Sequence, residues 1–347
     1  MDYRQLGYSG ITVSGYGLGV MTFGGQTGES DALRQLDMAF DAGVTLYDTA
    51  ENYPTPISAA TQGRSEAILG AWIKARGHQG RVVVATKVAG PGNAAGDISH
   101  IRGADRRLDR HNIAAAVDAS LKRLGTDCID LYQVHWPERA VSTLGRQRFS
   151  LLADSAGQVT IEETLAALTE HVAAGKLRAV GVCNETPWGV MRYLFMADLM
   201  TVPRIASIQN GYSLLDRQFE IGLAEVAIRE KIPLIGFSPL ARGTLTGKYA
   251  WDAGAGTNAS PQFAARMLSP GRRAAIDAYV ALAREAGLEP AHLALAFAEQ
   301  QPFMGSVLMA ASGVEQLAGN LGAIGVSLSR ETVQAINAVH DRHPNPK

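Results

Sequence analysis

The 347-residue sequence is poor in cysteine. Cys128 and Cys183 are too few for a disulfide framework and lack the spacing of a metal site. It also has no excess of charge of either sign, since 32 Lys and Arg residues are matched by 33 Asp and Glu residues. This balance gives no electrostatic reason to expect nucleic acid or an anionic membrane as a partner. We therefore predict neither partner, and no bound metal.

Long hydrophobic runs are absent as well. No stretch reaches the roughly 18–20 apolar residues that a membrane span needs, and Met1–Gln5 opens without a signal-like run. These observations favour a reducing, cytoplasmic setting. A hydrophobic content of 46% and a charged content of 19% are typical of a soluble globular protein with ample material for a core.

Short aliphatic or β-branched runs alternate with longer amphipathic segments along the whole chain, which is typical of parallel α/β proteins. Strands are predicted at Tyr16–Val20, Thr45–Asp48, Val82–Lys87, Ile129–His135, Ala179–Asn184, Ala206–Gln209, Leu234–Ser238 and Ser306–Met309. Helices are predicted at Asp31–Asp41, Ser65–Lys74, Asn112–Arg123, Ile161–Ala174, Pro187–Leu199, Glu220–Glu230, Arg273–Glu285 and Val314–Leu321.

A glycine-rich turn normally opens the first helix of a doubly wound dinucleotide-binding fold. Here the glycines of Gly15–Gly19 lie within the first strand instead. We therefore predict an α/β fold of the (β/α)₈ TIM-barrel type, forming a single domain over residues 1–347.

A short β-hairpin is predicted before the barrel, with Arg4–Leu6 and Ile11–Val13 flanking Gly7–Gly10 and capping the barrel floor. Segments 52–64, 89–109 and 137–159 follow strands two, three and four and are too long for plain turns. Segment 250–271 follows strand seven. We expect these long loops to lie over the C-terminal face, and the last to cover a cofactor.

Ionisable residues end three consecutive strands: Asp48, Lys87 and His135. Barrel enzymes build their active sites at these strand ends, and Tyr53 lies on the loop that leaves the Asp48 strand. We expect Lys87 to lower the pKa of Tyr53, Asp48 to pair with Lys87, and His135 to orient a carbonyl oxygen. The group predicts a proton donor beside a developing alkoxide.

Simpler interpretations remain open for these residues. Asp48 and Lys87 could form a structural ion pair at the barrel rim, and His135 could be a hydrogen-bonded structural histidine. Tyr53 alone carries little weight, and its prediction depends on the group.

Several motifs resemble those of the aldo-keto reductases, and in particular the bacterial Tas-like branch. They occur in the right order between about residue 3 and residue 340: Gly19–Gly24, Asp48–Tyr53, Gly63–Glu66, Leu131–Pro137, Gly175–Arg178, Gly181–Asn184, Ile208–Leu215 and Gly243–Tyr249. Thr61–Gly63, in the extended second loop, resembles the same branch. The resemblance implies a catalytic tetrad of Asp48, Tyr53, Lys87 and His135.

It also implies a nicotinamide cofactor that lies extended over the C-terminal face. Asn184 and Gln209 would bind the carboxamide and Tyr212 would stack on the ring. The pyrophosphate would lie along Ser238, Leu240, Gly243 and Lys248, and the adenosine end would meet Ser312, Gln316 and Asn320. Each could instead be structural, with Asn184 and Gln209 satisfying loop backbone, Tyr212 packing at the rim and Lys248 solvated.

Two departures from the family pattern bear on the cofactor. Cys183 replaces a common serine, which weakens one expected hydrogen bond to the carboxamide. No Arg or Lys occurs near Ser312–Gln316, where many relatives bind the 2′-phosphate, so the charge would have to come from Arg242 or Arg266. The resemblance still favours NADPH, with NADH the less favoured cofactor.

Met21 and Trp136 are predicted to line the substrate pocket, although both could be core of the barrel mouth. The basic group Arg102, Arg106, Arg107, Arg110 and His111 is predicted to be a solvated loop rather than an anion site.

The predicted function is NADPH-dependent reduction of aldehydes or ketones to alcohols, with Tyr53 as general acid and a small carbonyl compound as the substrate. The alternative is a cofactor-binding regulatory subunit with slow turnover. A homo-oligomer is possible on either interpretation.

Overall fold

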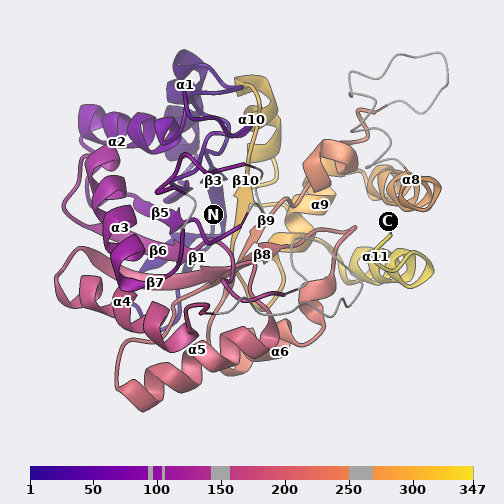
Figure 1. Cartoon of the computed structure of the whole chain (residues 1–347). Coiled ribbons are helices and arrows are strands. Elements are labelled where there is room, and N and C mark those ends of the chain that lie inside the picture. Colours follow the sequence, from indigo (N-terminus) through magenta and orange to yellow (C-terminus); the bar gives the residue numbers. More distant parts are fainter. Residues whose placement is uncertain (93–96, 104–105, 142–156, 250–268, 347) are drawn as a thin grey trace.

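Eight parallel strands close into a barrel in the computed structural model, in the order β10-β3-β4-β5-β6-β7-β8-β9 (Figure 1). The structure describes residues 1–92, 97–103, 106–141, 157–249 and 269–346. The barrel strands are β3 (Tyr16–Gly19), β4 (Leu46–Asp48), β5 (Val83–Val88), β6 (Ile129–Val134), β7 (Leu177–Cys183), β8 (Ile208–Gly211), β9 (Leu234–Phe237) and β10 (Met304–Met309). Each overlaps one predicted strand, so the predicted (β/α)₈ TIM barrel is confirmed.

Alternate residues of these strands point into the barrel, as the period of two along a strand requires. Leu46, Val83, Leu131 and Ile235 belong to one buried apolar cluster inside the barrel. Their neighbours of opposite parity, such as Val84, pack with the surrounding helices in a larger cluster. The interior is therefore a packed core, and its upper layer is where polar side chains occur.

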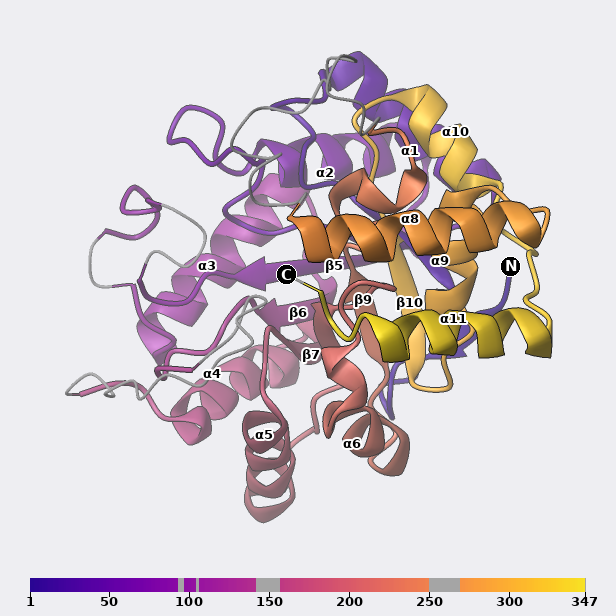
Figure 2. The same ribbon diagram turned by 90° about the vertical axis from the view of Figure 1, so that its right-hand side faces the viewer.

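The predicted N-terminal hairpin is also confirmed. Strands β1 (Tyr3–Gln5) and β2 (Thr12–Ser14) pair antiparallel, and Leu6, Ile11 and Val13 join the apolar cluster inside the barrel. In Figure 2 the N-terminus lies at the right, on the side of the barrel opposite to the one toward which the β5 arrow points. The hairpin thus closes the floor of the barrel.

Helices surround the strands: α1 (Glu29–Asp41), α2 (Arg64–Arg76), α3 (Arg110–Leu124), α4 (Ile161–Ala173), α5 (Pro187–Met200), α6 (Leu223–Arg229), α8 (Pro270–Glu285), α9 (Pro290–Glu299), α10 (Val314–Leu321) and α11 (Arg330–Arg342), with 3₁₀ turns η1 (Gln218–Glu220) and η2 (Ala241–Thr246). Thr186 caps α5 by accepting from the Gly189 N–H. Gly125, Gly175 and Gly287 adopt left-handed conformations after their helices.

Two helices, α9 and α11, were not predicted. α9 is the one that leads into β10, and its residues Leu293–Glu299 are all buried, so it has no polar face to produce a helical period. The predicted helix Arg273–Glu285 is α8, which lies beside the C-terminal α11 outside the ring of the barrel (Figures 1 and 2). α6 is shorter than predicted because Gly222, with φ of 87°, separates it from η1.

Long connections follow β4, β5, β6 and β9, as predicted. Most of segment 137–159, and residues 250–268 of the segment expected to cover a cofactor, lie outside the described residues. Ala89, Ile98, Ile101 and Trp136 from the second and third of them form a small apolar cluster of their own. Among the described residues, no helix combines the length and hydropathy that crossing a bilayer requires.

Candidate active site

The structure brings the four predicted catalytic residues together in the upper layer of the barrel. Lys87 Nζ, fully buried, donates to Asp48 Oδ2 over 2.6 Å and to the Thr49 carbonyl over 2.7 Å. The carboxylate and the carbonyl satisfy an ammonium group that would be costly to bury alone. Asp48 ends β4 and Lys87 is next to last in β5, so adjacent strand ends create the pair.

Tyr53 and His135 lie against this ion pair. The Lys87 ammonium is 5.2 Å from the centroid of the Tyr53 ring, and the His135 ring meets the Tyr53 ring edge-on with centroids 5.7 Å apart. His135 follows the last residue of β6, while Tyr53 comes from the loop after β4. Three neighbouring strand ends therefore converge on one phenol.

Burial raises the pKa of Tyr53 to about 12, although the Lys87 charge acts in the opposite direction. Lys87 lowers this pKa, as expected, but the loss of hydration of the phenolate and the Asp48 charge raise it by more, so the net shift is upward. Tyr53 therefore holds its proton throughout the neutral range. Burial would lower the pKa of Lys87, but Asp48 and Tyr53 raise it, so Lys87 stays charged.

His135 is the neutral member of the group. Burial, reinforced by the nearby Lys87 charge, lowers the pKa of His135 well below its usual value of 6.5. Its Nδ1 atom is buried and has no hydrogen-bond partner among the described residues. The imidazole is therefore neutral, and a hydrogen bond to a ligand would use its other nitrogen, Nε2.

Two glutamines hold the other oxygen of the Asp48 carboxylate. Gln209 Nε2 donates to Asp48 Oδ1 over 2.7 Å, and Gln133 Nε2 donates to the same atom over 3.3 Å. Gln133 was not predicted, although a glutamine within an apolar strand two residues before His135 was a usable signal. Gly181 leaves room for Gln133, since a Cβ there would lie 3.3 Å from Gln133 Cγ.

Cys183 and Asn184 extend this network at the end of β7. The Cys183 thiol lies 3.6 Å from Gln209 Oε1, and burial raises its pKa to about 12, so it is a neutral thiol. Asn184 Nδ2 donates to the His135 carbonyl over 2.9 Å. Asn184 and Gln209 thus both lie beside the tetrad, with part of their hydrogen-bonding capacity used by the protein itself.

The predicted stacking residue lies elsewhere. Tyr212 is 1% exposed, its hydroxyl donates to Glu220 over 2.6 Å, and its ring packs with Phe297 and Phe303 outside the barrel. Phe237, the last residue of β9, is only partly buried and packs against the interior apolar cluster. Gly211 lies beside it, since a Cβ there would be 3.4 Å from the Phe237 ring. The aromatic ring at the mouth is therefore that of Phe237.

The loop after β9 is a tight turn in which Ser238, Ala241, Arg242 and Gly243 all have positive φ. The Ala241 N–H donates to the Ser238 carbonyl within this turn. Lys248 adds a cation, because its Nζ lies 3.2 Å from where a Gly243 Cβ would be. Leu240, between these residues, accepts from the Gly243 N–H. Arg242 is exposed, and Arg266 lies outside the described residues.

The three residues predicted for the adenosine end lie around α10. Ser312 is exposed and its hydroxyl donates to Gln316 Oε1 over 2.9 Å, just before the helix begins. Asn320 is buried, with its amide 3.5 Å from the Ala310 carbonyl. Ser312 and Gln316 are therefore accessible polar groups, whereas Asn320 lies behind them.

Arginines that were predicted to be solvated hold the loops over the barrel mouth in place. Arg102 pairs with the buried Glu51, and Arg106 is 4% exposed and donates to the carbonyls of Ile98 and Gly92. Arg107 pairs with Glu138 and Arg110 with Glu170. The prediction of a solvated loop is wrong for Arg102 and Arg106, which hold the loop between β5 and α3 together.

The two predicted pocket residues differ in exposure. Met21 is 41% exposed, whereas Trp136 is 4% exposed and its indole N–H donates to the Pro91 carbonyl over 2.9 Å. The Trp136 ring nevertheless lies 4.8 Å from the His135 ring. Both residues are therefore near the tetrad. Met21 is joined to the loop that carries Tyr53, because the Thr55 N–H donates to the Met21 carbonyl.

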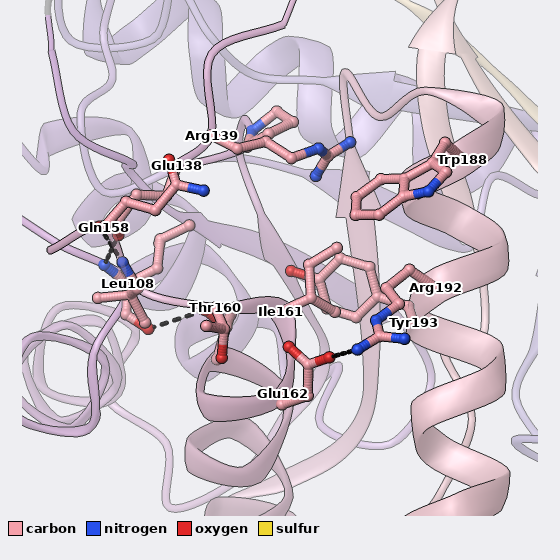
Figure 3. Close-up of a pocket in the computed structure, with 13 residues that line it drawn as sticks. Leu108, Glu138, Arg139, Gln158, Thr160, Ile161, Glu162, Trp188, Arg192 and Tyr193 are labelled. Atoms are coloured by element: carbon pink, nitrogen blue, oxygen red, sulfur yellow. Dashed lines mark hydrogen bonds and ion pairs between the residues drawn. The ribbon is translucent and has the colours of Figure 1, made fainter. Parts of the chain in front are cut away.

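A cavity of about 200 Å³ lies outside the barrel, between the start of α4 and α5 (Figure 3). None of the tetrad lines it. Its charged groups are already paired, since Arg192 binds Glu162 and Arg139 binds Glu185. Within the described part of the chain, no group of His, Cys, Asp and Glu residues could hold a metal ion.

Comparison with known proteins agrees with this geometry. The sequence profile described as "Aldo/keto reductase family" matches residues 16–341. Protein tas of Escherichia coli K12 is 45% identical over 349 aligned positions, which cover 100% of this chain and 99% of that protein. Two proteins of Bacillus subtilis are also similar: the uncharacterized oxidoreductase YrpG, at 32% identity over 100% of this chain and 97% of its own, and the aldo-keto reductase YhdN, at 31% over 98% and 93%. The resemblance to the Tas-like branch is thus confirmed, and the chain belongs to the aldo/keto reductase family of oxidoreductases.

Proposed function

We propose that this oxidoreductase reduces aldehydes or ketones to alcohols with NADPH, in a single domain spanning residues 1–347. The observation that carries the proposal is the contact of Lys87, held by Asp48 at 2.6 Å, with the ring of Tyr53. When bound, the nicotinamide supplies the hydride that adds to the carbonyl carbon. The residues of the chain provide the proton and the charge stabilisation.

Tyr53 is the proposed general acid. Its phenol keeps its proton at neutral pH because burial raises the pKa to about 12. As negative charge develops on the carbonyl oxygen, the Lys87 ammonium stabilises the phenolate that Tyr53 becomes. The neutral His135 ring offers the hydrogen bond that orients the carbonyl oxygen beside the phenol. No charge has to move to His135 in this scheme.

The residues present fit a nicotinamide dinucleotide. Phe237 offers a partly exposed ring, and we assign to it the stacking role predicted for Tyr212. Asn184 and the side-chain oxygen of Gln209, which can still accept a hydrogen bond, lie close enough to the tetrad to bind the carboxamide of the nicotinamide. The turn at Ser238, Leu240 and Gly243, with the Lys248 cation, suits a pyrophosphate, and Ser312, Gln316 and the buried Asn320 suit the adenosine end.

The preference for NADPH over NADH rests on the family, whose members generally use NADP(H), and on Arg242 as a source of positive charge. The proposed substrate is a small carbonyl compound that enters between Met21 and Trp136. We keep a cytoplasmic location as part of the proposal.

The test is a steady-state assay that follows NADPH absorbance with 4-nitrobenzaldehyde. Wild type is expected to consume NADPH, and Tyr53→Phe to lose about 10²–10⁴-fold in turnover, the usual contribution of a general acid. Tyr8→Phe is the matched control, because Tyr8 is 68% exposed in the hairpin turn at the opposite end of the barrel.

Equal turnover by wild type and Tyr53→Phe contradicts the assignment of Tyr53. Tight NADPH binding by wild type without turnover on a broad panel of carbonyl compounds would instead support the regulatory alternative.

A further inference from the structure

The outward face of α5 is apolar. Trp188, Met191, Phe195 and Leu199 are 62%, 41%, 57% and 66% exposed, and the intervals of three, four and four residues align them along one side of the helix. A surface helix normally carries polar residues on this side. The inward side, which includes Tyr193, is apolar and buried as usual, so packing against the barrel does not explain the outward residues.

The neighbouring segment adds to this surface. Ile221 and Ile228, just before and within α6, are 74% and 52% exposed. α5 and α6 lie side by side at the lower edge of the molecule in both views (Figures 1 and 2), and a Cβ at Gly222 would lie 3.4 Å from Pro187. We call these six residues the α5–α6 face: Trp188, Met191, Phe195, Leu199, Ile221 and Ile228.

The size of the face matches one half of a stable interface. If a large side chain carries on the order of 150–250 Å², six that are 41–74% exposed present roughly 500–900 Å² of apolar surface. The largest patch on a monomer is usually about 300–600 Å². A stable protein–protein interface buries about 800 Å² on each partner, so the face with its polar rim is large enough for one.

The composition of the face also fits an interface. Aromatic residues, Met and Arg are enriched at such contacts and Lys is depleted. Here the Arg139 guanidinium lies 5.0 Å from the Trp188 ring centroid and that of Arg192 lies 5.8 Å from the Phe195 ring centroid. α5 contains no Lys.

Charges around the face are balanced, which decides the kind of partner. Arg192 pairs with Glu162, Arg204 with Asp198 and Glu230, and Arg229 with Glu225. A rim with one dominant sign would select a partner of opposite charge and repel its own copy. A rim of paired opposite charges meets its own copy without that repulsion, and closed two-fold dimers are the commonest soluble assembly.

We infer that the α5–α6 face is the interface of a homodimer. Met191, Phe195 and Leu199 are four residues apart and form one ridge of α5, centred on Phe195. Two such ridges pack into each other's grooves when the helices cross at about 50°. In an antiparallel crossing, a two-fold axis beside Phe195 places Met191 of one copy next to Leu199 of the other and brings the two Phe195 rings together.

The test is the mass of the full chain in solution, measured by light scattering after size exclusion. Wild type is expected at twice the 36.8 kDa of the chain, and Phe195→Glu, which places a charge on the two-fold axis, at 36.8 kDa. Tyr8→Glu changes an aromatic residue on the hairpin that is 68% exposed, against 57% for Phe195, and is expected to remain dimeric. Circular dichroism melting establishes that each variant is folded.

A cysteine cross-link tests the geometry without relying on a destabilising charge. Under mild oxidation, Phe195→Cys is expected to form a disulfide-linked dimer at least tenfold faster than Tyr8→Cys. A wild type that stays monomeric at micromolar concentration, or a Phe195→Glu variant that stays dimeric, overturns the inference. A monomeric wild type would leave the face to some other occupant.

Discussion

Gln209 Nε2 donates to Asp48 Oδ1 over 2.7 Å, while Lys87 approaches the second carboxylate oxygen at 2.6 Å. One carboxylate is therefore held from both sides, by an amide from β8 and an ammonium from β5. Gln133 completes the arrangement, because it donates to Asp48 and accepts from Gln209. This buried amide pair fixes the orientation of Asp48, and through it the position of Lys87.

Replacing Gln133 with Leu should weaken this arrangement. The substitution removes one donor to a charged acceptor and leaves an N–H of Gln209 unpaired, so the free energy of unfolding should fall by about 1–3 kcal/mol. Urea denaturation measures this directly. Gln5→Leu is the matched control, because Gln5 is exposed on β1 and should change little. A Gln133→Leu protein as stable as wild type would show that the amide pair is dispensable.

Acid should destabilise the protein partly through His135. The pKa of His135 is depressed in the folded state, so its contribution to stability is present above pH 6.5 and lost as the pH falls toward the folded value. The advantage of wild type over His135→Gln should therefore shrink below pH 6.5, by up to about 1.4 kcal/mol per pH unit. Urea unfolding of both proteins at pH 7 and at pH 5 gives this difference, and a constant difference would contradict it.

High pH should destabilise the protein through Tyr53, just as low pH should destabilise it through His135. Because its pKa is raised from 10.0 to about 12, its contribution to stability is present below pH 10 and lost as the pH rises toward 12. Wild type should lose stability faster than Tyr53→Phe in this interval. The reduction rate should show no ionisation of Tyr53 near neutral pH, which a pH–rate profile tests. A break between pH 7 and 8 that disappears in Tyr53→Phe would mean that the phenol ionises far more easily.

The buried pair of Glu51 and Arg102 should contribute more to stability than an exposed pair. Glu51→Ala leaves Arg102 unpaired and removes the acceptor of the Ala89 N–H, so a loss of about 3–5 kcal/mol is expected. Glu225→Ala breaks the exposed pair with Arg229 and should cost less than about 1 kcal/mol. Similar losses in the two variants would refute the structural role of the buried pair.

Substitution of Phe237 should affect cofactor binding, whereas substitution of Tyr212 should affect stability. Phe237→Leu should weaken NADPH binding by about 2–10-fold, the usual worth of an aromatic contact. Tyr212→Leu should lower the free energy of unfolding, since it opens space between Phe297 and Phe303, yet leave the Kd of the folded protein unchanged. Fluorescence titration and urea denaturation measure the two effects. The reverse pattern would return the stacking role to Tyr212.

Sequence pattern predicted the barrel well because each strand has its own apolar run and each loop its own glycine or cap. It missed α9 because a helix buried on all sides has no polar face. Asp48, Lys87 and His135 were predictable from strand ends, whereas Tyr53 was added because it lies on the loop that leaves the Asp48 strand. Phe237 was not distinguished from Tyr212, since both are aromatic residues at strand ends, and the register decides which one points inward. Ile235 points into the barrel, and Phe237, two residues later on the same strand, therefore points the same way. This alternation within the predicted strand was the available signal.

The hairpin that closes the barrel floor has a kinetic consequence. With Leu6, Ile11 and Val13 packed into the lower end, both ligands of the proposed reaction must use the upper opening. A nicotinamide ring seated on Phe237 would then lie beneath the carbonyl compound. The deeper ligand has to arrive before the other and depart after it, so we expect a compulsory order of exchange. Product-inhibition patterns with the alcohol and with oxidised cofactor would reveal that order.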